Sequence, residues 1–197
     1  MMFVATRVLR FLILWGILST QALAETAAEP EIDSDLRQFL IETIDDSESF
    51  EDRFDAEVWL LAMSTKLERF IPSSEERLQL LKLVHGEAKA AELQPELVLA
   101  VIEVESAFDR YAISRVGAQG LMQVMPFWRK EIGRPDDNLT NVATNLRYGC
   151  RILQYYLLRE KGDLVRALAG YNGSLGKTWY SERVMLAWER RWLSGAL

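Results

Sequence analysis

The segment "PELVLAVIEVES", residues 95–106, constrains the fold more than any other part of this chain. Its proline, Pro95, stands where proline is tolerated, in the first turn of a helix. From Leu97 to Val104 apolar residues cover most of the circumference of a helix, so we expect this helix to be buried on several sides. The rest of the chain must therefore supply the elements that surround it.

The other segments also show helical periodicity. Apolar residues recur at helical spacing in residues 36–44, 56–70, 73–93, 141–162, 163–173 and 177–193. Ser73 and Glu76 have the spacing of a capping box, and Asp163 stands where an N-cap is expected. No stretch alternates as a strand would, and no tandem repeat is found. We therefore predict an all-α fold.

The amino terminus has the layout of a secretory signal peptide. Arg7 and Arg10 supply a positive start, residues 11–18 form an apolar run too short to span a bilayer comfortably, and residues 22–24 resemble a cleavage site. An uncleaved membrane anchor is the alternative. No cysteine lies near the cleavage point to suggest a lipoprotein. We predict a signal peptide over residues 1–24 and export of the mature protein.

Two parts are expected after the signal peptide: an N-terminal helical extension over residues 25–72 and a main domain over residues 73–197. Removal of the signal peptide, which carries two arginines and no acid, changes the formal net charge from -6 to -8. This acidic balance argues against nucleic acid as a partner, because phosphate binding needs clustered Lys and Arg.

Cysteine and histidine are too rare for most metal or redox chemistry. Cys150 is the one cysteine, so no intramolecular disulfide can form, and its apolar helical context predicts a small core residue. His85 is the one histidine, which argues against a catalytic triad and against zinc. We predict no metal and no cofactor.

Glu105 is the candidate catalytic residue. It lies at the carboxyl end of the apolar helix, where burial of a carboxylate is costly and raises its pKa. A carboxylic acid that stays neutral near pH 7 is the general acid that cleavage of a glycosidic bond requires. Glu103, two positions away, points to a different helix face, and we expect it to be solvated.

Three ordered motifs resemble the soluble lytic transglycosylase family, lysozyme-like enzymes that cut bacterial peptidoglycan. They are "ESAFDRYAISRVGAQGLMQVMP" (residues 105–126), the N-x-x-x-G of Asn145 and Gly149, and "ALAGYNGS" (residues 167–174). The segment "YSERV" is similar to the helix that closes the family's domain. The resemblance extends over residues 74–192 and implies a lysozyme-like helical domain that acts in the periplasm. Residues 25–72 lie outside the resemblance and form the short N-terminal helical extension that periodicity predicts.

The resemblance implies a reaction on peptidoglycan glycan strands that uses one carboxylate. Glu105 protonates the β-1,4 linkage between N-acetylmuramic acid and N-acetylglucosamine. It then takes the proton from the C6 hydroxyl of the muramic sugar as a 1,6-anhydro ring closes. The N-acetyl group of that sugar stabilises the developing cation, so that no second carboxylate is needed.

Seven further residues are implied in substrate binding. Ser114 resembles the serine that binds near the catalytic carboxyl, and Gln123 offers a donor and an acceptor to sugar hydroxyls. Ser106 either caps the helix or touches sugar. Gly117 and Gly120 either allow close approach of the backbone or simply form turns. The resemblance implies that Tyr171 reaches the catalytic carboxyl and that Asn172 lines the groove.

Two departures from the family pattern accompany these matches. Ile152 stands where the family often has a tyrosine in G-x-x-Y-L, and Tyr148 and Tyr155 are candidates to compensate. The family's Y-N-A-G is replaced by "YNGS" over residues 171–174. Glycan positioning is therefore the feature in which this chain is expected to differ from its family.

Two alternatives to the transglycosylase remain open. A muramidase-type hydrolase needs a second acid, for which Asp109 is the candidate, although its position favours a local cap or turn. A non-catalytic peptidoglycan-binding protein would keep the fold without the reaction. The sequence also leaves open a protein partner in the cell wall or in a secretion machine.

Overall fold

The computed structural model describes residues 53–193, which form a bundle of helices. Its elements are α2 (Arg53–Leu67), α3 (Ser74–Ala90), α4 (Pro95–Ser106), α5 (Trp128–Ile132), α6 (Val142–Arg159), α7 (Leu164–Asn172), α8 (Trp179–Ala187) and a short π-helix, η1 (Trp188–Trp192). Within residues 53–193 there is no strand, only two isolated β-bridges. The all-α prediction is confirmed for this part of the chain. The predicted signal peptide and the helix over 36–44 lie outside the described residues.

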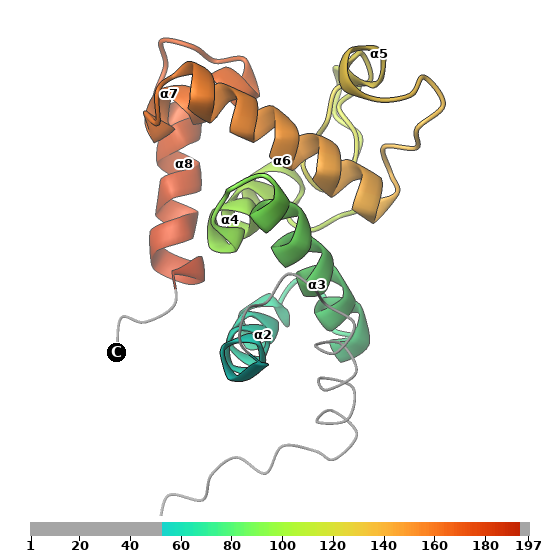
Figure 1. Ribbon diagram of the computed structural model, residues 1–197, viewed down its shortest axis with the longest axis vertical. Coiled ribbons are helices and arrows are strands. Elements are labelled where there is room, and N and C mark those ends of the chain that lie inside the picture. The colour runs from blue at the N-terminus through green and yellow to red at the C-terminus, as the bar shows by residue number, and fades with distance from the viewer. Residues whose placement is uncertain (1–52, 194–197) are drawn as a thin grey trace, which may run out of the picture. The chain divides into compact units, whose positions relative to one another are not determined.

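Helix α4 is the centre of the bundle, as its sequence predicts. It packs against α3, α8 and η1, and Figure 1 shows it enclosed by the other helices. All residues from Leu97 to Ile102 are buried. Because α4 is apolar on nearly every side, it needs neighbours on nearly every side.

Local side-chain caps fix where three of the helices begin. Ser73 Oγ accepts a hydrogen bond from the Glu76 amide at 3.3 Å, and Asp163 plays the same part for α7 at 3.0 Å. Asn141 caps α6 in the same way. Each cap satisfies one of the amides that the first turn of a helix leaves without a partner.

Helix α2 shares the core of the domain. Ala56, Leu60, Met63 and Leu67 have no exposed surface, and α2 packs against α3. Arg77 of α3 reinforces this contact: its guanidinium donates to Ser64 Oγ at 3.0 Å and to the backbone carbonyls of residues 71 and 72. The helix ends at Leu67, three residues earlier than its periodicity predicts, and a turn follows in which the amides of residues 70 and 71 donate to the Leu67 carbonyl.

A long loop, residues 107–127, lies between α4 and α5 and packs against α6. Asn145, which is 1% exposed, accepts a hydrogen bond from the Met122 amide and donates to the carbonyls of Gln119 and Leu139, each at 2.8 Å. Gly149 lies directly beneath Met122, whose sulfur would be 2.3 Å from an added Cβ. The N-x-x-x-G motif therefore fastens this loop to α6.

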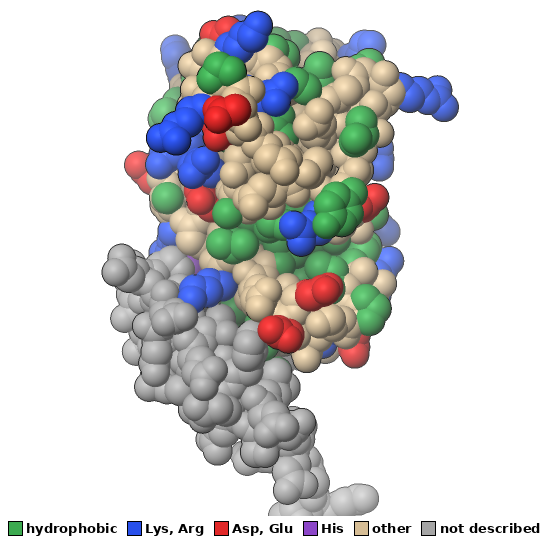
Figure 2. Space-filling view, turned by 90° about the vertical axis from the view of Figure 1, so that its right-hand side faces the viewer, with side chains coloured by type: hydrophobic (Ala, Val, Ile, Leu, Met, Phe, Trp, Pro, Cys, Tyr) green, Lys and Arg blue, Asp and Glu red, His purple; other side chains and the backbone are tan. Residues whose placement is uncertain are grey.

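Charged and apolar side chains are mixed on the surface. On the face drawn in Figure 2, Lys and Arg side chains lie mostly toward the edges, with acidic side chains among them. That face offers no continuous basic surface of the kind that binds a phosphate backbone. Across residues 53–193 we find no helix with the length and apolarity needed to cross a bilayer.

Candidate active site

The Glu105 carboxyl lies at the end of α4, between α4 and α8. Its Oε1 atom accepts a hydrogen bond from the Tyr180 hydroxyl at 2.6 Å. Burial raises the pKa of Glu105 from its ordinary value of 4.5 to about 7. The Tyr180 hydrogen bond, the Arg183 guanidinium and the Asn172 side chain oppose this rise, because each favours the ionised form. The acid can therefore hold or release a proton near neutral pH.

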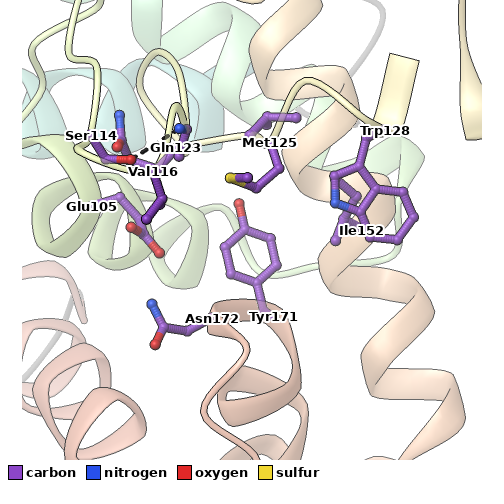
Figure 3. Close-up of a pocket in the computed structure, with 11 residues that line it drawn as sticks. Glu105, Ser114, Val116, Gln123, Met125, Trp128, Ile152, Tyr171 and Asn172 are labelled. Carbon is purple, nitrogen blue, oxygen red and sulfur yellow. Dashed lines mark hydrogen bonds between the residues drawn. The ribbon is translucent and has the colours of Figure 1, made fainter. Parts of the chain in front are cut away.

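A cavity of about 220 Å³ opens next to this carboxyl. Figure 3 shows Glu105 on one side of Tyr171, with Trp128 and Ile152 on the other side. The cavity is lined from three parts of the chain: the end of α4, the loop before α5 together with α5, and the facing residues of α6 and α7. The lining residues are Glu105, Ser114, Val116, Ala118, Gln123, Val124, Met125, Trp128, Ile152, Tyr171 and Asn172.

Ser114 and Gln123 bring polar groups of the loop to the cavity. Ser114 Oγ accepts a hydrogen bond from the Ala118 amide at 3.0 Å, which closes the turn that carries it. Gln123 donates from Nε2 to the carbonyls of Ala112 and Gly120, so its amide oxygen is the group left to face a ligand. Both side chains are thereby held in place before any ligand arrives.

Three other predicted residues, at the end of α4 and in the loop, do not line the cavity. Ser106 Oγ donates to the carbonyls of Ile102 and Leu121, which ties the end of α4 to the loop. Gly117 and Gly120 both have a positive φ, +89° and +73°. Gly120 also lies against α6, where an added Cβ would be 2.5 Å from the Asn145 side chain. These three residues shape the loop rather than the cavity wall.

The tyrosine that donates to the Glu105 carboxyl is Tyr180, and the expectation that Tyr171 reaches this carboxyl is wrong for this structure. The Tyr171 hydroxyl donates instead to the Met122 carbonyl at 2.6 Å, since its ring rises from α7 toward the loop. Sequence analysis included Tyr180 only in the closing motif "YSERV". The contact with Glu105 arises because α4 and α8 pack together, and no local sequence signal reports it.

Glu103 is not solvated, which corrects the expectation from its helix face. Its side chain is 15% exposed, and its Oε2 atom lies 2.9 Å from Arg191 Nε and accepts from Trp192 Nε1 at 2.8 Å. The residue does face away from Glu105, but η1 covers that face. Glu103 thus joins η1 to α4.

Asp109 has the turn role that its sequence position favours. Its Oδ1 atom accepts a hydrogen bond from the Tyr111 amide at 2.9 Å, and its side chain does not line the cavity. Of the residues that line the cavity, Glu105 is the one acid. No cluster of three or more His, Cys, Asp or Glu side chains suited to a metal ion occurs among residues 53–193.

The missing tyrosine of α6 is not replaced by its neighbours. Ile152 lines the cavity, whereas the Tyr148 hydroxyl is engaged by Asp137, to which it donates at 2.6 Å. Tyr155 is exposed. The aromatic ring that does reach this part of the cavity belongs to Trp128, from a short helix that sequence periodicity did not predict. Cys150 is buried in the core, as expected.

Comparison with known families identifies the family of this chain. The model of the family described as "Transglycosylase SLT domain" matches residues 82–184, which is more than half of the chain and includes Glu105, Tyr171 and Tyr180. The chain belongs to the Transglycosylase SLT domain family. The matched region of this SLT domain starts within α3 and ends within α8, so α2 lies outside it.

Curated relatives of the SLT domain carry related names. The chain is 47% identical over 92 residues to "Membrane-bound lytic murein transglycosylase C" of Actinobacillus pleuropneumoniae serotype 5b (strain L20), which covers 42% of this chain and 25% of that protein. It is 38% identical over 81 residues to "Transglycosylase" of Enterobacteria phage PRD1, covering 41% of this chain and 29% of that protein. The chain thus spans about a quarter of the length of the relatives it matches.

Solved structures that resemble this SLT-domain chain are also much longer. An inactive mutant of the lytic transglycosylase Slt from Pseudomonas aeruginosa is 26% identical, with a TM-score of 0.45, over 61% of this chain and 24% of that one. The 70 kDa soluble lytic transglycosylase from Escherichia coli is 20% identical, with a TM-score of 0.45, over 77% of this chain and 30% of that one.

Proposed function

We propose that this protein is a peptidoglycan lytic transglycosylase in which Glu105 acts first as acid and then as base. The observation that carries the proposal is the partly buried Glu105 carboxyl, whose pKa is raised by burial to about 7 and which opens on a cavity. The curated relatives named lytic murein transglycosylase and transglycosylase support the same activity.

The proton movements balance on this one side chain. Neutral Glu105 gives its proton to the oxygen of the β-1,4 linkage, and the bond from that oxygen to C1 of the N-acetylmuramic acid breaks. The Glu105 carboxylate then accepts the proton of the C6 hydroxyl, whose oxygen forms the new bond to C1. The products are a free N-acetylglucosamine hydroxyl and a 1,6-anhydromuramic end, and Glu105 is neutral again. A pKa near 7 suits both steps, since neither form is strongly disfavoured.

Tyr180 supports the ionised intermediate state of Glu105. Its hydroxyl donates to Oε1, so in the neutral acid the proton would be carried by Oε2, the other oxygen. The same hydrogen bond becomes charge-assisted, and therefore stronger, once the carboxyl has given up its proton. Ser114, Gln123 and Asn172 are proposed to bind the sugar hydroxyl and acetamido groups.

Product analysis tests this proposal against hydrolysis. Purified peptidoglycan is digested and the soluble products are examined by mass spectrometry. We expect anhydromuramic ends, each lighter by one water than the reducing end that a hydrolase leaves. Glu105→Gln is expected to abolish product formation and keep glycan binding, whereas Asp109→Asn, the matched control, is expected to remain active. Hydrated ends that disappear in Asp109→Asn would instead indicate a muramidase. Full activity of Glu105→Gln would remove Glu105 from the mechanism.

The envelope location and the domain boundaries are part of the proposal. We propose that residues 1–24 direct export and are removed, and that residues 25–72 extend the domain formed by residues 73–197. The name "membrane-bound lytic murein transglycosylase" of the relatives supports an envelope location. Cell fractionation followed by sequencing of the mature amino terminus tests this: recovery in the periplasmic fraction with a start near Glu25 is expected, and recovery in the cytoplasm with Met1 retained would contradict it.

A further inference from the structure

The cavity has a polar end and an apolar end. Ser114 and Gln123 lie on the Glu105 side, whereas Trp128 and Ile152 lie together on the far side of Tyr171 (Figure 3). Trp128 is only partly buried: it packs on the core cluster and also lines the cavity. An apolar aromatic surface therefore faces the same space as the candidate catalytic acid.

The helix that carries Trp128 is held in place mainly by its flanks. Helix α5 has five residues and none of them is buried, and of these five only Trp128 packs against the core cluster. Arg129 Nε donates to the Pro126 carbonyl at 3.3 Å, which closes the turn on one side of Trp128.

On the other side, a clamp centred on Tyr148 joins the segment after α5 to α6. The Tyr148 hydroxyl donates to Asp137 Oδ2 at 2.6 Å and accepts from the Arg134 amide at 3.2 Å. Gly133 lies so close that an added Cβ would be 1.4 Å from the Tyr148 hydroxyl oxygen. The clamp keeps α5, and with it the indole ring, at a fixed position relative to Ile152.

We propose that Trp128 is a stacking platform for a pyranose ring of the glycan, at a ring adjacent to the one whose linkage Glu105 cleaves. The proposal rests on the proposed function and specifies how that site holds its substrate. A pyranose presents an apolar face of C–H groups, and an aromatic ring can bury that face at low cost in conformational entropy. Tryptophan stacking is tolerant of the substituents at the edge of the ring, in the same way that aromatic side chains bind successive nucleobases.

A sugar suits this platform better than a stem peptide because of what surrounds it. The cavity combines the indole with a carboxyl, a hydroxyl and two amide side chains, which can bind the hydroxyl and acetamido groups at the edge of the same rings. An indole against the face of the sugar ring and hydrogen-bonding side chains at its edge together complement an N-acetylhexosamine. Trp128 is then a determinant of glycan affinity and takes no part in proton transfer.

Steady-state kinetics on soluble, peptide-free glycan strands test the platform. Trp128→Ala is expected to raise KM about tenfold, equivalent to about 1.4 kcal/mol, and to change kcat by less than about threefold, because the stacked ring is held equally in the ground state and the transition state. Trp128→Phe is expected to recover most of the affinity. Tyr155→Ala removes an exposed aromatic ring on α6 that does not line the cavity, so it serves as the matched control.

Binding by the folded protein gives a second readout. The indole N–H signals of the Glu105→Gln variant are followed by ¹⁵N NMR while the N-acetylglucosamine tetramer is added. We expect the Trp128 signal to shift, and the Trp59 signal, whose N–H donates to Glu96 outside the cavity, to stay in place.

The outcomes separate this proposal from the proposed function. Anhydro products from the parent enzyme, with an unchanged KM in Trp128→Ala or an unmoved Trp128 signal, would overturn the platform and leave the transglycosylase intact. A Trp128 response to peptide-bearing fragments alone would also overturn it, in favour of stem-peptide recognition. If the parent enzyme forms no anhydro products, the proposed function fails. In that case a shift of the Trp128 signal with the tetramer would still support the platform, and an unmoved Trp128 signal would overturn the platform too.

Discussion

Replacement of the candidate catalytic acid should make this protein more stable, by an amount that depends on pH. Burial raises the pKa of Glu105 from 4.5 to about 7, so the folded protein binds this proton more tightly than the unfolded chain does. The contribution is fully present below pH 4.5 and is lost as pH rises to about 7. The difference in pKa corresponds to about 3 kcal/mol of stability lost across this range.

Glu105→Gln removes the ionisation and keeps the shape and an acceptor oxygen for Tyr180. We therefore expect the variant to be about 3 kcal/mol more stable than the parent at pH 8 and nearly equal to it at pH 4. For a chain of this size the gain at pH 8 corresponds to a rise in Tm of about 6–12 °C.

Urea unfolding, followed by far-UV circular dichroism between pH 4 and pH 8, measures this difference. Glu131→Gln, which replaces an exposed carboxylate on α5, is the control and is expected to follow the parent at every pH. A Glu105→Gln variant whose stability differs from that of the parent by a constant amount across the range would refute the reasoning. It would mean that Glu105 ionises in the folded protein as it does in the unfolded chain.

Three further perturbations have defined outcomes. Tyr180→Phe removes a hydrogen bond that favours ionised Glu105, so the pKa of Glu105 should rise by about one unit. The alkaline limb of the pH–rate profile should move to higher pH by the same amount. A profile that does not move would contradict the contact. Gly120→Ala places a Cβ at positive φ against α6 and should lower the free energy of unfolding in urea by about 3 kcal/mol. Gly117→Ala, also at positive φ but in open space, should lower it by about 1 kcal/mol. Equal losses would argue against a packing role for Gly120. Burial raises the pKa of the Cys150 thiol, so a thiol reagent should modify the native protein at pH 8 far more slowly than the unfolded protein; equal rates would show that the site is open.

Local signals in the sequence were sufficient for the longer helices of residues 53–193 and for the position of the acid. Ser73 and Asp163 cap the helices they were expected to cap, because a cap involves only residues within one turn of each other. The apolar circumference of α4 predicted that Glu105 would be poorly solvated, and its raised pKa agrees. The role of Asp109 in a turn was also local and also predicted.

The same local signals could not predict the contacts around the acid. Tyr180 is 75 positions from Glu105, and Glu103 is 89 positions from Trp192, so neither hydrogen bond leaves a periodic or local trace. Glu103 was expected to be solvated because helix periodicity reports which face a residue is on and not what covers that face. Helix α5 was missed for a related reason: five residues with no buried side chain have no apolar period.

By itself, then, the sequence determined that residues 53–193 are helical and that one apolar helix lies at their centre. It also determined that this helix carries a partly buried carboxyl group at its end. Only the tertiary structure decided which tyrosine contacts that carboxyl, what fills the opposite end of the cavity and which face of α4 is covered by η1. The physical reason is how far apart in the sequence the interacting residues lie. Caps and amphipathic periodicity act within a few residues, whereas the pKa and the shape of a site depend on groups that only the packing of distant helices brings together.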